Sequence, residues 1–334
     1  MNLGVIAEFS LKEAITSLSA AAFSGRERSN LVVSTIDGDV RIMRIETVRK
    51  PRLVQVSVAT GLPPVVALST GNVTDVGTTD LIVGGLDNAL RVISSVERKL
   101  VVRDTVQLGS LPTALCVTNV VGNETAEVIV ATNDGALRCY GWFEASLDKL
   151  AHKTTDRPTF SLQPLRNRGM PYSGLVFGDD SGSLYVYHYA DDRLQELSRL
   201  TVGGEGHLLA TGNITGDKND DVVIVSDGRA LGLLAMGQSK LEMKTGLKLP
   251  SEVSSLQVGH LQKDSHLQHI VLSLRDSTIL LLSYNGEELI QDASLKTAPK
   301  PVESLLALGD FDGDGNTEIV QAIGNNLNLI TAVP

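Results

Sequence analysis

One short segment near the end of the chain holds the densest group of side chains that could do chemistry. Residues 310–318 read Asp-Phe-Asp-Gly-Asp-Gly-Asn-Thr-Glu, with carboxylates at the first, third, fifth and ninth positions. Two glycines allow the loop to coil so that alternate positions face one centre. Hard oxygen ligands at this density suit Ca²⁺, which takes about six to eight of them. The predicted ligands of a structural Ca²⁺ site are Asp310, Asp312, Asp314, Glu318 and, through its backbone carbonyl, Asn316.

Two other interpretations of this segment are weaker. A calcium loop of the EF-hand type needs a glutamate at its twelfth position and a helix on each side. Gln321 stands at that position here, and the flanking residues favour strands. A solvated acidic turn would leave four crowded carboxylates to repel one another with no cation between them.

The same loop recurs in worn form earlier in the chain. Residues 213–221 keep an oxygen-bearing side chain at every odd position but have only two carboxylates among them, which predicts a weak or empty second site. Its ligands would be Asn213, Thr215, Asp217, Asn219 and Asp221. The copy at 260–268 does not offer a hard-cation set, because its odd positions are His260, Gln262, Asp264, His266 and Gln268. Three histidines of this region could hold a transition metal instead, although scattered surface histidines are the simpler interpretation. They are His260, His266 and His269.

These loops belong to a repeat that covers the chain. An apolar run, a short polar turn and a second apolar run recur seven times at intervals of 47 to 50 residues, and Asp-Gly or Asn-rich pairs suit the turns of tight hairpins. The predicted hairpins lie near 31–45, 81–93, 128–142, 175–189, 222–236, 270–284 and 319–331. A leucine-centred strand precedes each hairpin and an amphipathic strand follows it. Four strands per period predict an all-β fold, a seven-bladed β-propeller with four-stranded blades, as a single domain over residues 1–334.

The two ends of the chain are expected to close the ring. The sequence stops after the third strand of the seventh period, and residues 4–11 belong to no period of their own. An N-terminal strand that completes the last blade would leave no unpaired edge at the seam. The alternative is a helical N-terminus, because residues 11–15 have fair helix propensity.

The acidic loop and its flanks resemble a known repeat. Residues 309–320, Gly-Asp-Phe-Asp-Gly-Asp-Gly-Asn-Thr-Glu-Ile-Val, look like the FG-GAP/VCBS repeat of integrin-α-type propellers, and residues 212–223 look like a worn copy of it. Among the members of that family, the chain is similar to intracellular ones, such as the FG-GAP subunit of the KICSTOR complex and the propellers of Bardet-Biedl proteins. Residues 138–144 are loosely similar to a hairpin end in the former. These relatives are scaffold subunits, so the resemblance implies binding to other proteins within a complex.

Composition narrows the partners and the compartment. The net charge of −10 argues against nucleic acid, which needs a basic face, and no window of 18 apolar residues predicts membrane insertion. Residues 1–10 lack the pattern of a secretion signal. Cys116 and Cys139 are expected on strands that are not neighbours, as free buried thiols in a reducing compartment. The expected location is therefore cytoplasmic.

The expected function is a non-enzymatic scaffold that binds other proteins. The sequence has no phosphate loop, nucleophile elbow or zinc-protease motif. One alternative is a propeller hydrolase or lyase with its active site at the central channel. Another is a carbohydrate-binding propeller, although aromatic residues make up only 4% of the chain and none recurs once per blade. A group of aromatic residues in the third and fourth blades is either core packing or a partner-binding patch. Its members are Trp142, Phe177, Tyr185, Tyr187 and Tyr189.

Overall fold

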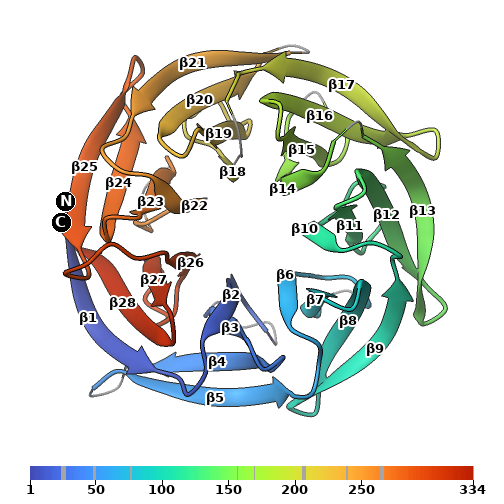
Figure 1. The fold of residues 1–334 in the computed structure, drawn as a ribbon, viewed down its shortest axis with the longest axis horizontal. Coiled ribbons are helices and arrows are strands. Elements are labelled where there is room, and N and C mark those ends of the chain that lie inside the picture. Colours follow the sequence, from blue (N-terminus) through green and yellow to red (C-terminus); the bar gives the residue numbers. More distant parts are fainter. Residues whose placement is uncertain are drawn as a thin grey trace.

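The chain forms a ring of antiparallel sheets around a central axis (Figure 1). The computed structural model describes residues 1–23, 28–47, 50–75, 77–155, 157–168, 170–204, 208–237, 240–263 and 267–333. Within these residues there are 28 strands in seven four-stranded sheets and no helix. The predicted seven-bladed β-propeller is therefore confirmed. None of the described segments is a helix long and apolar enough to cross a membrane.

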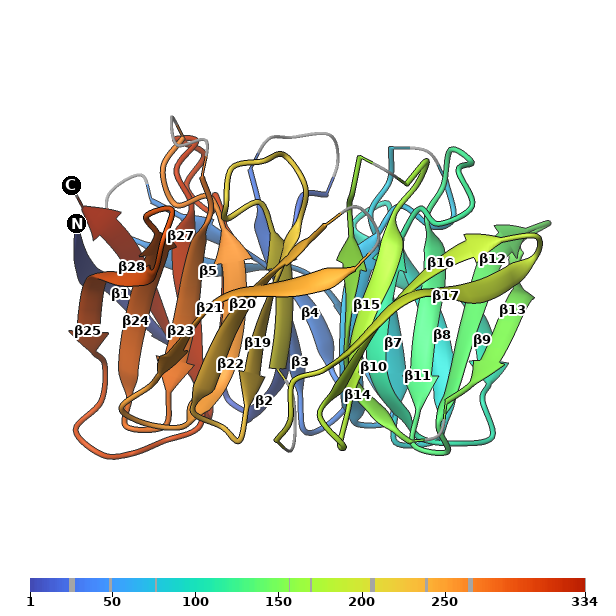
Figure 2. The same cartoon turned by 90° about the horizontal axis from the view of Figure 1, so that it is seen from above.

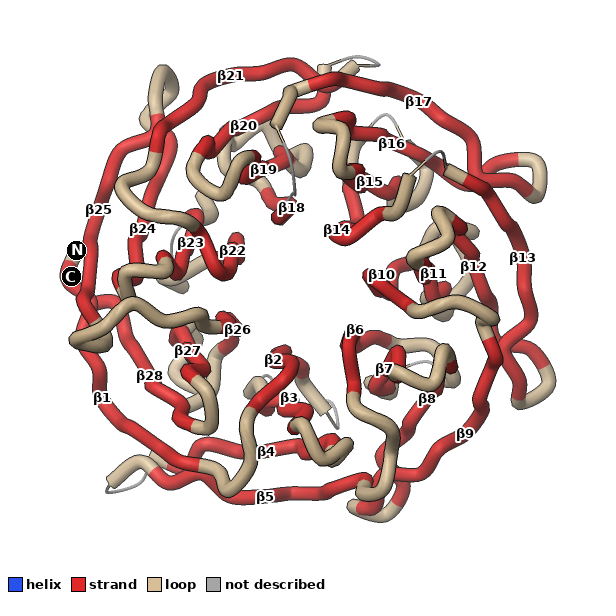
Figure 3. The backbone as a smooth tube through the Cα atoms, viewed as in Figure 1, coloured by secondary structure: helices blue, strands red, loops and turns tan. Residues whose placement is uncertain are grey.

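Each blade runs outward from an innermost strand to an outermost one (Figure 3). Blade one comprises β2 (Ile15–Ala21), β3 (Asn30–Thr35), β4 (Val40–Glu46) and β5 (Arg52–Ala59). Blade two comprises β6 (Val65–Gly71), β7 (Asp80–Gly85), β8 (Ala89–Val96) and β9 (Lys99–Gln107). Blade three comprises β10 (Pro112–Thr118), β11 (Glu127–Thr132), β12 (Ala136–Phe143) and β13 (Ser146–Thr154). Blade four comprises β14 (Thr159–Leu165), β15 (Gly174–Asp179), β16 (Ser183–Ala190) and β17 (Arg193–Thr201).

The remaining three blades follow the same order. Blade five comprises β18 (Leu208–Gly212), β19 (Asp221–Ser226), β20 (Ala230–Met236) and β21 (Leu241–Lys248). Blade six comprises β22 (Val253–Gly259), β23 (His269–Leu274), β24 (Thr278–Tyr284) and β25 (Leu289–Lys296). Blade seven comprises β26 (Leu305–Gly309), β27 (Glu318–Ile323), β28 (Asn326–Val333) and, from the other end of the chain, β1 (Asn2–Ser10).

The second strand of each blade is the most buried element. Every residue of β7, β11, β15, β19 and β23 is buried, because neighbouring blades cover both faces of these strands. The strands therefore read as continuous apolar runs. The outermost strands are mostly exposed or half-buried instead, as β9 and β13 are. The core consists of the apolar layers between adjacent blades, such as the layer that joins Val92 of blade two to Val130 of blade three.

The ring closes through the two ends of the chain. Strand β1 pairs antiparallel with β28, from Asn2 opposite Val333 to Ser10 opposite Asn326. Figure 1 shows both termini side by side at the rim. The prediction that an N-terminal strand completes the last blade is confirmed, and the helical alternative is wrong. Ala7 and Phe9 of β1 pack against the core of blades seven and one. They are two residues apart, and alternate side chains of a strand point to the same face.

The loops lie at the two faces of the disc, seen from the side in Figure 2. We call the loop face the one that carries the links from the first to the second strand of each blade. We call the turn face the opposite one, with the tight turns between second and third strands. The acidic segment 310–318 lies on the loop face, between β26 and β27.

Two smaller expectations are resolved by packing. Cys116 and Cys139 are free and buried, and they lie in one register row with Ile129 between them, so that a whole strand separates the thiols. Phe177, Tyr185 and Tyr187 are buried, and the rings of Phe177 and Tyr185 stack with centroids 5.1 Å apart. These three aromatic residues are therefore core packing rather than a surface patch.

Candidate metal centre and the loop face

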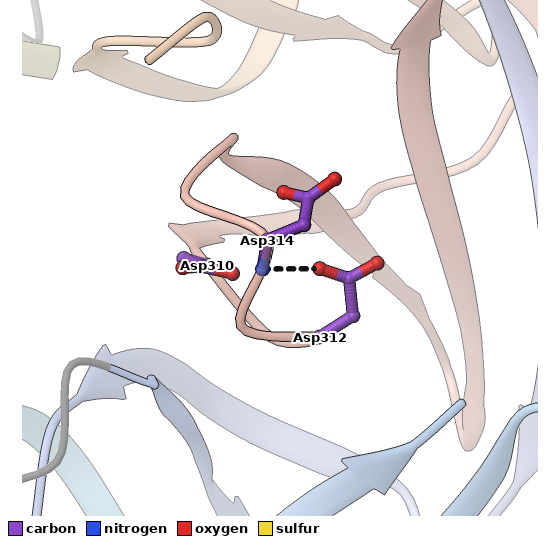
Figure 4. Close-up of side chains that lie close together, drawn as sticks. All are labelled: Asp310, Asp312 and Asp314. Atoms are coloured by element: carbon purple, nitrogen blue, oxygen red, sulfur yellow. Dashed lines mark hydrogen bonds between the residues drawn. The ribbon is translucent and has the colours of Figure 1, made fainter. Parts of the chain in front are cut away.

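Three of the five predicted calcium ligands come together in the blade-seven loop. Carboxylate oxygens of Asp310, Asp312 and Asp314 all lie within 4.8 Å of one another (Figure 4). Asp310 and Asp312 are half-buried and Asp314 is exposed, so an ion from solvent could reach the group. Three carboxylates at this spacing provide the hard oxygen ligands that Ca²⁺ prefers.

The loop coils because two glycines take left-handed backbone conformations. Gly313 has φ of 83° and Gly315 has φ of 88°, which a residue with a Cβ adopts only at a cost. Backbone N–H groups then turn inward. Those of Gly313 and Gly315 donate to the two oxygens of Asp310, at 2.6 and 3.0 Å, and that of Asp314 donates to Asp312 Oδ1 at 3.1 Å. The inward N–H groups fix the carboxylates and leave further oxygen lone pairs for a cation.

Crowding and burial both disfavour the charged forms of these acids. Burial raises the pKa of Asp312, and the carboxylates of Asp314 and Asp310 raise it further, while Arg28 lowers it. Burial raises the pKa of Glu318 to about 7. A divalent cation would relieve this repulsion, because an opposite charge within a few ångströms favours ionised carboxylates. The residues present therefore fit a hard cation.

Glu318 does not join the three aspartates. Its Oε2 atom accepts the backbone N–H of Phe311 at 2.8 Å. Equivalent carboxylates stand at the first residue of β7, β11 and β19, and they also accept N–H groups from the loop before them. We call these four residues brace carboxylates: Asp80, Glu127, Asp221 and Glu318.

The brace is a role that the sequence interpretation missed. Blades two and three keep it although they lack the other acids of the calcium pattern. The available signal is an acid that recurs as the first residue of the buried second strand in four blades. Spacing alone assigns this acid to the ninth ligand position, because it does not reveal which donor the acid finds.

Asn316 forms hydrogen bonds within its own loop and to the loop of blade six. Its backbone N–H and its side-chain amide donate to Asp314, at 2.7 and 3.1 Å. Its Oδ1 atom accepts the backbone N–H of Lys263 in blade six at 3.2 Å. The side chain is therefore engaged, and the prediction concerns only its backbone carbonyl.

The predicted second site in blade five has a different geometry. Asp221 accepts the N–H groups of Ile214 and Thr215 at 2.8 and 2.7 Å, and the hydroxyl of Thr215. Asn213, Asp217 and Asn219 also accept N–H groups through their side-chain oxygens. Among the described residues, the cluster of three potential metal ligands found in blade seven has no counterpart in blade five. This loop is held by its own hydrogen bonds.

In blade six, strand pairing shifts the loop by one residue from the predicted register. Gly259 pairs with His269, as Gly309 pairs with Glu318, so His269 rather than Gln268 occupies the brace position. The loop is one residue longer than in blade seven. His269 is buried, and its Nε2 atom lies 4.0 Å from Asp292 Oδ2. Of the other residues named for this loop, Asp264 and His266 lie outside the described residues.

Hydrogen bonds tie each first-to-second-strand loop to the same loop of the preceding blade. In six blades a backbone N–H near the end of the loop donates to a carbonyl near the start of the neighbouring loop, and in blade two the hydroxyl of Thr79 donates to Ala22. The six backbone pairs are Ser29 to Asp310, Ala126 to Asn72, Ser173 to Asn119, Asp220 to Arg166, Gln268 to Asn213, and Thr317 to Leu261. These bonds form a continuous belt around the loop face.

The belt fastens the acidic loop to blade one across the closing seam. The N–H of Ser29 donates to the carbonyl of Asp310 at 2.7 Å, and the guanidinium of Arg28 donates to the carbonyl of Phe311 at 2.5 Å. The candidate metal loop therefore contacts both blades beside it, blade one through these bonds and blade six through Lys263.

The turn face opens into a cavity of about 680 Å³ at the central channel. Its wall includes the exposed ring of Phe160 and the hydroxyl-bearing Ser254. Arg275 bridges Glu252, at 2.9 Å, and Glu303 at the rim. Because all three side chains are about half exposed or more, this is a surface ion-pair network of the kind that contributes little energy.

Comparisons with known proteins identify the fold. No protein-family model matches the chain, and no curated protein matches it in sequence. The structure of BBS1N in complex with ARL6DN, soaked with mercury, is similar with a TM-score of 0.74 and 12% identity, covering 98% of this chain and 96% of that one. The structure of Sqt1 from Saccharomyces cerevisiae is similar with a TM-score of 0.69 and 12% identity, covering all of both chains. At this identity the likeness is one of fold, the seven-bladed propeller.

Proposed function

We propose that the chain is a non-enzymatic interaction module that binds other proteins. The observation that carries this proposal is the belt of hydrogen bonds on the loop face. Loops that are fixed to one another present their outward side chains in set positions, and this preorganisation lowers the entropy cost of binding. Rigid scaffolds with such loops are where binding functions concentrate.

The structural neighbours support the proposal by analogy. BBS1N was solved in complex with ARL6DN, and its chain matches this one over almost the whole length. Together with the resemblance of residues 309–320 to the FG-GAP/VCBS repeat, this favours a scaffold subunit within a larger assembly. A cytoplasmic location fits the two free buried cysteines.

The proposal includes a structural Ca²⁺ ion in blade seven. Asp310, Asp312 and Asp314 would hold it, and the backbone carbonyl of Asn316 and waters would complete the shell. Glu318 would act beside the ion as a brace of the loop. The blade-five loop would stay empty, since its oxygens already accept hydrogen bonds from the protein.

Affinity capture of the full chain from its native cells tests the interaction proposal. The expected result is one or more proteins that co-purify reproducibly and in fixed proportion to the chain. A co-purifying small molecule without a protein partner would instead favour the channel-centred enzyme or the carbohydrate-binding propeller.

A further inference from the structure

The loop of blade four, which the structure describes over residues 166–168 and 170–173, is built differently from the braced loops. Its brace position is Gly174, which has no side chain. The sulfur of Met170 fills the place, because it lies 2.8 Å from where a Cβ of Gly174 would stand. Met170 also packs against the core between blades four and five. An apolar plug thus replaces the carboxylate, and the loop's own N–H groups need other acceptors.

Neighbouring blades supply those acceptors. The N–H of Arg166 donates to Asp220 Oδ2 at 2.8 Å, and the N–H of Arg168 donates to Asn219 Oδ1 at 3.0 Å, both in blade five. Burial raises the pKa of Asp220, and the backbone hydrogen bond from Arg166 and the positive charge of Arg166 both oppose that shift. This carboxylate is therefore committed to the loop backbone.

Blade three holds the other end of the loop. The N–H of Ser173 donates to the carbonyl of Asn119 at 3.1 Å. The ring of Tyr172 lies directly over Gly122, because ring atoms stand 1.9 to 2.5 Å from the place of a Cβ there. The N–H groups of Arg166, Arg168 and Ser173 are thus held from both sides, and the side chains of Met170 and Tyr172 also pack the loop in place.

Three side chains of the blade-four loop face solvent. Arg166 and Arg168 are exposed, and 47% of the surface of Tyr172 is exposed although its ring is fixed. Neither arginine has an ion pair with a described residue. The loop contains no carboxylate, on a chain whose net charge is −10. Arginine and tyrosine held in this way are the residue types that dominate binding energy at protein interfaces.

We propose that this blade-four loop is the docking site for an acidic surface of a protein partner. This inference rests on the proposed interaction function, and it adds that the partner binds the loop face through an acidic surface. The two guanidinium groups would pair with carboxylates of the partner, and the fixed ring of Tyr172 would supply the apolar contact beside them. Because the backbone is already ordered, binding would cost little further ordering of the loop.

Site-specific photocrosslinking in the native cell tests the inference on the full chain. A photoreactive phenylalanine analogue replaces Tyr172 on the loop face or, as a matched control, the exposed Phe160 on the turn face. The expected result is a protein adduct at position 172 whose crosslinked peptide is rich in Asp and Glu. Arg166→Glu with Arg168→Glu should lower the yield of that adduct about tenfold or more, because like charges then meet. Arg98→Glu with Arg103→Glu, two exposed arginines of blade two that form no ion pair with a described residue, should leave the yield unchanged.

The possible outcomes separate the two levels of the proposal. Adducts at position 160 but none at 172 would overturn the blade-four site and leave an interaction module that uses its other face. An adduct at 172 that survives charge reversal would overturn the acidic partner. Failure of both positions, together with no partner in the affinity capture, would count against the interaction function itself. Circular dichroism melting of each variant shows that the fold is intact, since the exposed arginine side chains are not part of the core.

Discussion

Four buried carboxylates each hold the backbone of the loop before them. Asp221 is one example, with two N–H groups and one hydroxyl as donors. Burial of an acid is costly, but leaving buried N–H groups without acceptors costs about 1–3 kcal/mol each. The brace is therefore a residue-scale device that keeps loops of the disc in register with the strands.

Asp221→Ala should destabilise the protein by about 2–4 kcal/mol, because it leaves the N–H groups of Ile214 and Thr215 without their acceptor. Asp217→Ala, in the same loop but exposed, should cost less than about 1 kcal/mol. Urea unfolding of both variants measures the difference. Equal losses of free energy of unfolding in the two variants would show that the brace carboxylate stabilises the protein no more than an exposed loop acid.

Glu127 should make stability depend on pH in a definite direction. Burial raises the pKa of its carboxyl in the folded state above 4.5, its value in the unfolded chain. The stabilisation from protonating it is therefore complete below pH 4.5 and is lost as pH rises through the folded pKa. Relative to Glu127→Gln, which keeps an acceptor oxygen, the parent should lose free energy of unfolding as pH rises above 4.5. Glu144→Gln, at an exposed turn, serves as the control. A parent-minus-variant difference that does not change with pH would contradict the assignment.

The Ca²⁺ proposal predicts a specific thermal shift. A ligand that binds only the native state at a hundredfold excess over its Kd stabilises by about 2.7 kcal/mol, so the melting temperature should be higher in Ca²⁺ than in EDTA. Mg²⁺ should stabilise less, because it prefers a small octahedral shell. Asp312→Ala should abolish the Ca²⁺ effect, and Thr215→Ala in blade five should not. Identical melting of the parent in EDTA and in millimolar Ca²⁺, with no heat of binding, would show that the loop is only an acidic turn.

At the scale of elements, the innermost strands of four blades end in a glycine that lies tightly against the next blade. Gly71, Gly212, Gly259 and Gly309 end these strands in blades two, five, six and seven, and a Cβ on any of them would meet a side chain of the next blade within 3.0 Å. In these four blades the glycine before the loop is therefore required by packing between blades. Glycine at this point lets the innermost strands of these four blades approach the next blade closely.

Gly71→Ala should destabilise the propeller by about 1–3 kcal/mol, because the new methyl group would stand 2.3 Å from Cγ1 of Val117, a branched side chain with little freedom to move. Gly4→Ala in β1 is the matched control, since nothing lies within 4 Å of its added Cβ. Thermal and urea unfolding of both variants checks the prediction. A loss in Gly4→Ala as large as in Gly71→Ala would mean that strand entropy, not packing, sets the effect.

At the scale of the whole molecule, the ring depends on one strand from the far end of the chain. Strand β1 covers the edge of β28 and buries Ala7 and Phe9 partly against the core of blades seven and one. Without it the seam would expose a strand edge, which invites association between molecules.

Removal of residues 1–11 should lower the cooperativity of unfolding and cause concentration-dependent association. Adding a synthetic peptide of residues 1–11 should restore the parent behaviour, because the peptide can pair with β28 in trans. Light scattering and calorimetry measure both effects. A truncated chain that stays monomeric and melts like the parent would show that β1 is dispensable for closure.

The sequence by itself determined the number of blades, the order of their strands and the way the ring closes. These features follow from local rules, the alternation of apolar runs and the turn chemistry of pairs such as Asp37-Gly38. Tertiary structure decided which acids meet. Spacing placed Glu318 with Asp310, Asp312 and Asp314, but it turns to the N–H of Phe311, because a carboxylate at the edge of a buried strand finds its nearest donor across the loop. The added residue in the blade-six loop moved His269 into the brace position, which only strand pairing reveals. The backbone N–H groups of Arg166, Arg168 and Ser173 likewise depend on acceptors in blades three and five, far away in sequence.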